Sequence, residues 1–438
     1  MPTVSQVLSI SDSQEPNPWL VKNGFLYFGQ NYGGNPDYKG YIKKLNLSTN
    51  EVTNLTPNGL DMWAMWQAVY DIKNNRIIAV GEVNDENGVL RAGVTIIDLS
   101  NDAVNKITHP NTGDCNEFIG VALDYKNNRL IVGERVYGGN TNGSSYPNGG
   151  GLWTIPLNTI TDPSTWSRVY EDPDYAVWST IAIFKDKVYA GIFRNGVKAV
   201  IACAPLSDLT SWTVLEQSSR NDRHAMVDAD DKMVAYTFVN ADGKVVVKYS
   251  TDGETWNQVT VCSAPSGAGA DQLRIIGKYI VVFVHDGSAK TQDIYLIDTS
   301  TNEVYLVQSM SGAITGHGRG AYDGEQKHYF GCQTPSTPSY IYSLAFDAKN
   351  TLVLSLSNSN PAPSEVITLT ATLTDENGNP VSGAEIEFYV IHFRQNGHCA
   401  VGDLIGTATT GSDGKASIQY TIPSDASGKL IFRAIYKG

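Results

Sequence analysis

Short apolar stretches bounded by polar turns recur along the chain up to about residue 345. Seven of them share one pattern, a run of aliphatic and aromatic residues that in most copies ends in glycine. They occupy residues 25–29, 77–81, 130–133, 188–191, 233–238, 279–284 and 329–331. Their spacing, about 45–58 residues, suits a repeating unit of four strands. The pattern predicts a seven-bladed β-propeller.

Polar turns separate the strands inside each unit. Residues 71–76 and 124–129 both read Asp-x-Lys-Asn-Asn-Arg between two apolar strands. Asparagine tolerates the positive φ that a tight hairpin requires, so these segments predict the turn between the first and second strands of a blade. A second hairpin recurs in similar form at 42–52 and 294–304.

In three of the units the strand after this second turn begins with tryptophan, at Trp166, Trp212 and Trp256. The segment 250–256 resembles a shortened Asp-box, the hairpin of sialidase-like propellers, and the units as a set resemble sialidase and YVTN-like repeats. The resemblance implies that Asp252 caps the turn and that Trp256 packs between sheets. We interpret this hairpin as a packing unit rather than a binding site.

The seventh unit lacks a fourth strand at its own end of the chain. Its strands at 329–331 and 340–344 are followed by a change of pattern, whereas residues 4–10 form an unassigned strand near the N-terminus. Pairing 4–10 with 340–344 would close the ring and remove the exposed sheet edge that an open array would leave. We therefore predict a propeller over residues 1–346 that is closed by its N-terminal strand.

Residues 347–438 alternate polar and apolar positions in short strands, as a β-sandwich does. Segments 375–384, 406–410, 413–416 and 432–436 resemble bacterial immunoglobulin-like modules of the invasin and surface-protein type. The predicted fold class is thus all-β, a seven-bladed propeller followed by an immunoglobulin-like sandwich. Residues 391–403 are longer than the usual hairpin and contain His392, His398 and Cys399, which lack zinc-site spacing and are interpreted as a surface loop.

Composition excludes several classes of function. A net charge of −13 argues against binding to nucleic acid, and no apolar run reaches the ~20 residues needed for membrane insertion. Five cysteines without CxxC spacing predict neither a metal site nor a disulfide framework, and we expect no cofactor.

The N-terminal residues lack the pattern of a signal peptide. Glycosylation sequons begin at Asn46, Asn54 and Asn142.

Loops that enter the innermost strands of a propeller converge on one mouth of its central channel. Aromatic rings at such positions could stack on sugars, and charged groups could bind hydroxyl or acidic groups. About half of such side chains would instead pack beneath the loops. The candidate ligand-binding residues are Trp63, Trp66, Glu117, Trp178, Arg223, His224, Asp271, His317 and Arg319, flanked by Trp19 and Tyr175.

These features favour a non-enzymatic recognition protein at a virion surface or outside the cell. The propeller would bind a host-surface glycan or protein, and the sandwich would connect it to other virion or surface proteins. A tail fibre or spike is the preferred setting, because no leader is expected and the composition resembles that of archaeal virus structural proteins. A cell-surface or S-layer adhesin is the first alternative.

A glycoside hydrolase that uses Glu117 and Asp271 as acid and base is the second alternative. Sialidase activity is not expected. The chain has seven units and one degenerate Asp-box, and no third arginine is identifiable that would complete a triad with Arg223 and Arg319.

Overall fold

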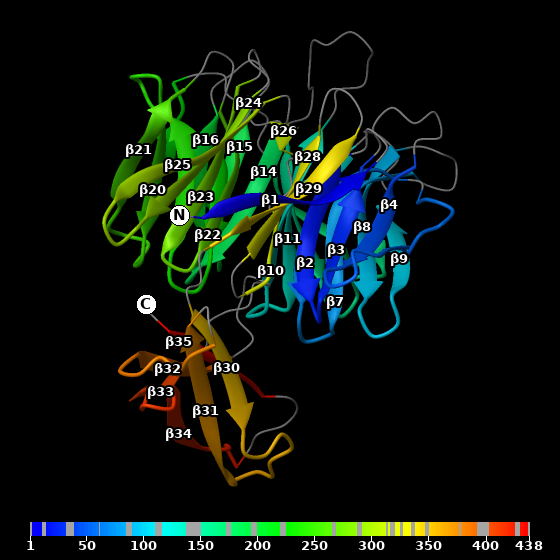
Figure 1. The fold of residues 1–438 in the computed structure, drawn as a ribbon. Coiled ribbons are helices and arrows are strands. Elements are labelled where there is room, and N and C mark those ends of the chain that lie inside the picture. Colours follow the sequence, from blue (N-terminus) through cyan, green and yellow to red (C-terminus); the bar gives the residue numbers. More distant parts are fainter. Residues whose placement is uncertain are drawn as a thin grey trace. The chain divides into compact units, whose positions relative to one another are not determined.

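The computed structural model in Figure 1 describes most of the chain as antiparallel β-strands. The description covers residues 2–436 except for 11–14, 32–38, 61, 85–89, 110–115, 137–149, 172–176, 194–198, 220–224, 265–268, 287–290, 312–313, 316–319, 325–326, 334–337, 347–349, 376–377, 392–402 and 425–429. The described residues divide into two compact units, one that ends at Ala345 and one that begins at Phe346. No helix in the described ranges is long and apolar enough to span a bilayer.

The first unit contains seven antiparallel blades, here numbered 1 to 7 in chain order, and one bridge between Arg135 and Val177 joins blades 3 and 4 into an eight-stranded sheet. Blade 1 contains β2 (Pro16–Lys22), β3 (Phe25–Gln30), β4 (Tyr41–Asn46) and β5 (Val52–Asn54). Blade 2 contains β6 (Met62–Asp71), β7 (Arg76–Asn84), β8 (Leu90–Asp98) and β9 (Ala103–Thr108). Blade 3 contains β10 (Asn116–Asp124), β11 (Arg129–Val136), β12 (Gly151–Pro156) and β13 (Ser167–Glu171), with the 3-10 turn η1 (Pro163–Thr165) before β13.

The other four blades repeat this arrangement. Blade 4 contains β14 (Val177–Phe184), β15 (Lys187–Phe193), β16 (Val200–Pro205) and β17 (Thr213–Gln217). Blade 5 contains β18 (Met226–Ala229), β19 (Val234–Val239), β20 (Lys244–Ser250) and β21 (Asn257–Ser263). Blade 6 contains β22 (Gly269–Ile276), β23 (Tyr279–Asp286), β24 (Thr291–Asp298) and β25 (Glu303–Ser311). Blade 7 contains β26 (Ile314–Thr315), β27 (Ala321–Tyr322), β28 (Lys327–Gln333), β29 (Ser339–Ala345) and β1 (Thr3–Ile10).

The N-terminal strand completes blade 7, as predicted. Strand β1 pairs antiparallel with β29 from Thr3 opposite Ala345 to Ile10 opposite Ser339. Figure 1 shows the blue strand β1 beside the yellow strand β29. Ile10 is buried in a core that also includes Leu26 of blade 1, so the closing strand contributes apolar contacts as well as backbone hydrogen bonds.

Glycines within the second strands allow neighbouring blades to approach closely. A Cβ atom on Gly133 would lie 2.3 Å from the Trp178 carbonyl oxygen of blade 4. The corresponding distance is 1.8 Å from Gly191 to Ala225 of the next blade, and 1.6 Å from Gly331 to Pro16 of blade 1. The glycine at the end of the repeat is therefore a consequence of packing between blades.

The repeated Asp-x-Lys-Asn-Asn-Arg segments form the predicted hairpins. Asn75 adopts a φ of 49°, and the equivalent Asn128 adopts 53°. Arg76 Nε donates to Asp71 Oδ2 at 2.8 Å within the turn, and its Nη2 donates to the Leu157 carbonyl oxygen of blade 3 at 3.1 Å. The same two bonds recur one blade later, where Arg129 binds Asp124 and the Leu206 carbonyl oxygen. The motif thus closes a turn and also links two blades.

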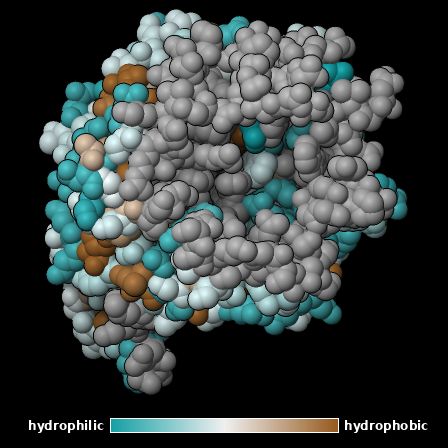
Figure 2. Space-filling view, turned by 90° about the horizontal axis from the view of Figure 1, so that it is seen from above, coloured by the Kyte–Doolittle hydropathy of each residue, from teal (hydrophilic) through white to brown (hydrophobic). Residues whose placement is uncertain are grey.

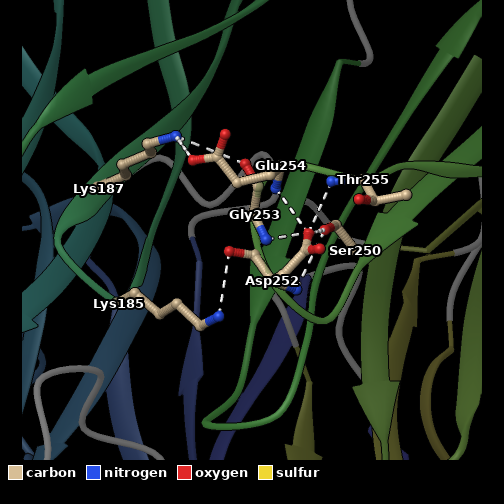
Figure 3. A network of polar contacts seen from close by, with 7 residues as sticks. All are labelled: Lys185, Lys187, Ser250, Asp252, Gly253, Glu254 and Thr255. Carbon is tan, nitrogen blue, oxygen red and sulfur yellow. Dashed lines mark hydrogen bonds and ion pairs between the residues drawn. The ribbon is translucent and has the colours of Figure 1, made fainter.

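The Asp-box hairpin also has its predicted form. Asp252 Oδ1 accepts hydrogen bonds from the backbone N–H groups of Glu254 and Thr255, both at 2.7 Å, and these bonds hold the pKa of Asp252 well below its usual range. Figure 3 shows Lys185 and Lys187 of blade 4 reaching this hairpin of blade 5.

The tryptophan of the Asp-box lies between two blades. The ring of Trp256 packs between Tyr189 of blade 4 and Tyr236 of blade 5, with centroids 6.1 and 4.7 Å away. The hairpin is therefore a packing unit.

The second unit contains two three-stranded sheets. One has the order β30 (Asn350–Leu356), β31 (Val366–Asp375), β34 (Lys415–Thr421), and the other β33 (Asp403–Thr409), β32 (Glu385–Ile391), β35 (Ile431–Tyr436). Leu369 and Leu373 of the first sheet share a buried core with Ile386 and Phe388 of the second. Two sheets around one core form a β-sandwich. The predicted all-β class is confirmed.

Candidate ligand-binding mouth

The first strands of the blades contact one another in order around the channel axis, from β2 to β22. In five of them the pairing register slips by one residue, which marks a β-bulge. The bulges fall at Trp19, at Trp63 and Trp66, at Ile119, at Ser179 and at Asp271. A bulge re-aims the side chain of its extra residue, and bulges are common beside binding sites. Four of these residues were named from sequence as mouth residues or their neighbours: Trp19, Trp63, Trp66 and Asp271.

The structure brings Trp66 and Glu117 together. The indole Nε1 of Trp66 in blade 2 donates to Glu117 Oε1 in blade 3, and Arg135 Nη1 lies 3.5 Å from the other carboxylate oxygen. Glu117 is fully buried, whereas the Arg135 side chain keeps a quarter of its surface exposed. A buried carboxylate must be compensated by donors, and here one indole and one guanidinium do so.

A second buried carboxylate in blade 3 had no role in the sequence analysis. Arg168 Nη2 lies 3.1 Å from Glu134 Oε2, and Arg168 Nη1 lies 3.2 Å from Glu171. Burial raises the pKa of Glu134, and the charge of Arg168 opposes that rise. A Cβ on Gly151 would lie 2.4 Å from Arg168 Nε, so the ion pair lies where only glycine leaves room. Local sequence carries no signal for this pair, because Glu134 lies in β11 and Arg168 in β13.

Neutral amides connect the inner strands of blades 1, 2 and 4. Asn17 Nδ2 donates to the Met65 carbonyl oxygen at 3.2 Å, and the Met65 N–H donates to Asn31 Oδ1 at 2.7 Å. Gln67 Nε2 donates to the Ser179 carbonyl oxygen at 3.0 Å, which connects blade 2 directly to blade 4. Sequence reasoning missed these amides, because a buried asparagine or glutamine resembles a turn residue until its partners are known.

Trp178 is not available as a mouth residue, contrary to the sequence interpretation. Its side chain is fully buried in a core with Ile131 and Leu152 of blade 3. Its ring packs edge-on against Tyr170 and Trp212, with centroids 5.6 and 4.7 Å away. A large aromatic side chain at the start of an inner strand gains more from burial between blades than from exposure to a ligand.

The structure describes the other predicted mouth residues only in part. Trp19 is partly buried against Gly29, whose Cβ would lie 2.2 Å from the indole. Trp63 and Asp271 lie at bulges, and their side chains are outside the described set. The predicted residues outside the described ranges are Tyr175, Arg223, His224, His317 and Arg319.

Two of the three sequons lie in described turns. Asn46 Oδ1 accepts hydrogen bonds from the Ser48 backbone N–H at 3.0 Å and from its hydroxyl at 2.7 Å. Asn54 Oδ1 accepts one from the Thr56 N–H at 3.0 Å. Asn142 lies outside the described residues, and glycosylation of all three stays a prediction.

Cysteines and acidic groups in the described part of the chain form no cluster of three that would hold a metal ion. Cys203, Cys262 and Cys332 are free thiols. Cys115 and the predicted loop with His392, His398 and Cys399 lie outside the described residues.

Figure 2 shows one face of the molecule with a hollow near its middle. The described residues visible inside the hollow are mainly hydrophilic.

No protein-family model matches the chain, and no curated protein sequence matches it. Among solved structures, the chain is similar to an oligogalacturonate lyase from Vibrio parahaemolyticus, with a TM-score of 0.50 and 12% identity over 78% of this chain and 93% of that one. It is also similar to an acylaminoacyl peptidase from Pyrococcus horikoshii, with a TM-score of 0.50 and 10% identity over 84% of this chain. The match covers 59% of that peptidase, and 56% of a prolyl endopeptidase with a TM-score of 0.48.

At these identities the likeness shows the fold alone. The chain has the β-propeller fold of these enzymes, with a small β-sandwich after it. Function has to be argued from the site, because one propeller fold supports many activities.

Proposed function

We propose that this chain is a non-enzymatic recognition protein that binds a glycan at the channel mouth beside Trp66. The observation that carries the proposal is the state of Glu117, the one predicted catalytic carboxylate whose side chain is described. It is fully buried and already bound by Trp66 and Arg135. A general acid or base must reach the substrate, so this carboxylate is better suited to holding the indole in place than to proton transfer.

Several features of the mouth support glycan binding. Trp66 lies at a bulge of an inner strand, is partly exposed, and is oriented by its bond to Glu117. Aromatic faces and neutral amides are the usual surfaces that bind sugar rings and hydroxyl groups. The partner we propose is a glycan, or a glycosylated protein, on a host surface.

We propose the exposed surface of a virion, as part of a tail fibre or spike, as the setting of the protein. The β-sandwich unit would attach the propeller to other virion or surface proteins. An adhesin on a cell surface would use the same two units in the same way. Finding the polypeptide in purified particles would favour the virion setting, and finding it in a cell-envelope fraction would favour the adhesin.

A glycan-array measurement on the full chain, followed by product analysis, tests the proposal. We expect binding without release of shortened glycans. Trp66→Ala should weaken binding about fivefold or more, since stacking on an indole contributes about 1 kcal/mol. Tyr305→Ala on the outer strand β25 is the matched control and should leave binding unchanged.

Two results would contradict the proposal. The first is glycan cleavage that Glu117→Gln abolishes, which would indicate a hydrolase. The second is binding that Trp66→Ala leaves intact while the thermal unfolding temperature of the variant matches that of wild type.

A further inference from the structure

The first strand of the β-sandwich, β30, has one unpaired edge. Among the described strands only β31 pairs with it, from Asn350 opposite Asp375 to Leu356 opposite Leu369 (Figure 1). The backbone N–H and C=O groups along the other edge of such a strand can pair with a further strand.

The ladder with β31 shows which backbone groups point to the unpaired edge. Residue pairs of an antiparallel ladder alternate between hydrogen-bonded and non-hydrogen-bonded. The Ser357 N–H donates to the Thr368 carbonyl oxygen at 2.9 Å in the same register, which fixes this alternation. The backbone groups of Leu352, Leu354 and Leu356 therefore point away from β31, toward the unpaired edge.

Nothing in the sequence of β30 opposes the addition of a strand. Proteins usually protect an edge with a charged side chain, a proline, a bulge or a very short strand. Strand β30 is seven residues long, contains neither a charged residue nor proline, and pairs with β31 without a register slip. Val353 and Leu356 in this strand are 58% and 38% exposed. An uncharged, apolar edge of this kind favours pairing between chains.

The other described outer edges carry the protection that β30 lacks. Strand β5 has only three residues, and the uncharged strands β1 and β21 each lie in a pair with a register slip. The remaining edge strands of the sandwich and the remaining outermost strands of the blades each contain a charged residue. These residues are Asp403 in β33, Lys415 in β34, Arg433 in β35, Lys106 in β9, Arg168 in β13, Glu216 in β17 and Glu303 in β25.

The sequence of β30 is complementary to itself in an antiparallel pair. With a two-fold axis at Val353, Leu352 lies opposite Leu354 of a second copy, and Val353 lies opposite Val353. The outward backbone groups of Leu352 and Leu354 are then the ones that exchange hydrogen bonds, as this register requires. Both leucines pack against the sandwich core, so the pair would continue the apolar layer on one face and join the two valines on the other. No charged side chain of β30 meets another.

We propose that β30 is the surface through which two copies of this chain associate, by antiparallel pairing of their β30 strands. The pair joins two three-stranded sheets into one sheet of six strands. This interface gives the β-sandwich a specific partner and does not depend on glycan binding at the mouth. A two-fold assembly carries two propellers, which raises the avidity for any surface that both can reach.

Sedimentation velocity of the full chain at micromolar concentrations tests the interface, and we expect a dimer. Val353→Lys places two cations opposite each other and should raise the dissociation constant of the dimer about tenfold or more. Val366→Lys is the matched control and should leave the dimer unchanged. Val366 is 54% exposed, but it lies in β31, which has β30 and β34 on its two sides. Thermal unfolding of each variant shows whether it is folded.

A charge exchange identifies the partner and the register. Val353→Glu alone should weaken the dimer as Val353→Lys does, because two like charges again lie opposite each other. An equimolar mixture of the two variants should form a mixed dimer, because a lysine then faces a glutamate. This recovery requires residue 353 of one copy to lie near residue 353 of the other.

Three results would overturn the proposal. The first is a wild-type chain that stays monomeric at micromolar concentrations. The second is a dimer that Val353→Lys leaves intact, which would place the contact on another surface. The third is a mixture of folded Val353→Lys and Val353→Glu that does not associate, which would contradict the two-fold register. None of these results changes the expectation for glycan binding, which the array measurement tests separately.

Discussion

Val4 and Leu344 lie opposite each other in one antiparallel pair of strands, although they come from the two ends of the propeller sequence. This pairing makes the ring continuous: blade 7 takes its outermost strand from the start of the chain and its inner strands from the end. The stability of the whole unit therefore depends on a strand of eight residues.

Deletion of residues 2–10 tests this dependence. It removes the buried Ile10 and the partly buried Val7 and Leu8 from the core between blades 7 and 1. Burial of two or three such side chains is worth about 4 kcal/mol or more, and we expect the thermal unfolding temperature to fall by about 10 °C or more. Ser5→Ala, at an exposed position of the same strand, is the control and should change nothing. An unchanged unfolding temperature after the deletion would refute closure by β1.

The buried ion pair of the repeated turn should contribute far more to stability than an exposed ion pair. Asp71 is fully buried and is bound by Arg76, whereas Lys126 and Asp186 form a pair with both side chains mostly exposed. Arg76→Ala leaves the buried Asp71 carboxylate with the neutral donors Asn74 and Tyr125 but without this cation, and we expect a loss of about 3 kcal/mol in urea unfolding. Lys126→Ala should have no measurable effect, because solvent screens an exposed pair. Equal effects of the two substitutions would contradict the linking role of the turn motif.

Two glycines of blade 3 face the same carbonyl oxygen of Trp178 at different distances. A Cβ atom would lie 2.3 Å from it on Gly133 and 3.0 Å on Gly120. We expect Gly133→Ala to destabilise the protein by about 3 kcal/mol, and Gly120→Ala to cost clearly less. Chemical denaturation of both variants measures the order. The reverse order would mean that blades 3 and 4 do not pack as described.

Two buried histidines should each lower stability as pH drops below neutrality. Burial lowers the pKa of His328 to about 3 and that of His109 to about 4, with a further contribution from Arg274 beside His328. The unfolded chain takes up these protons near pH 6.5 and the folded chain does not, so unfolding is favoured between about pH 6.5 and 4. Each histidine contributes a slope of up to about 1.4 kcal/mol per pH unit.

His328→Leu isolates the contribution of one histidine to the pH dependence of stability. The His328 ring lies among Phe283 and Phe330, so leucine suits its surroundings. Unfolding free energies at pH 7.5, 6 and 5 should show a shallower pH dependence in this variant. An identical slope in both proteins would show that His328 titrates normally in the fold.

Repeats and turns were predictable because their causes are local. Asn75 and Asn128 occupy the positive-φ positions expected of them, and Asp252 caps its hairpin. The pairing of β1 with β29 was predictable because an unpaired edge at one end of the chain matched a missing strand at the other.

The site was less predictable because its features depend on register and on distant partners. Trp66 is the extra residue of a bulge in β6, which turns its side chain toward the mouth. Trp178 lies one residue before the equivalent bulge of β14, and its side chain is buried. A difference of one residue in register therefore separates the two outcomes. The state of Glu117 depends on Arg135, eighteen residues further along, and on Trp66 in the previous blade. No local pattern identifies such partners.

The most direct test of the account is a crystal structure of the full chain with its tightest-binding array glycan. We predict a sugar ring stacked against the Trp66 indole. A glycan bound on the outer strands of the blades, or on the β-sandwich, would contradict it.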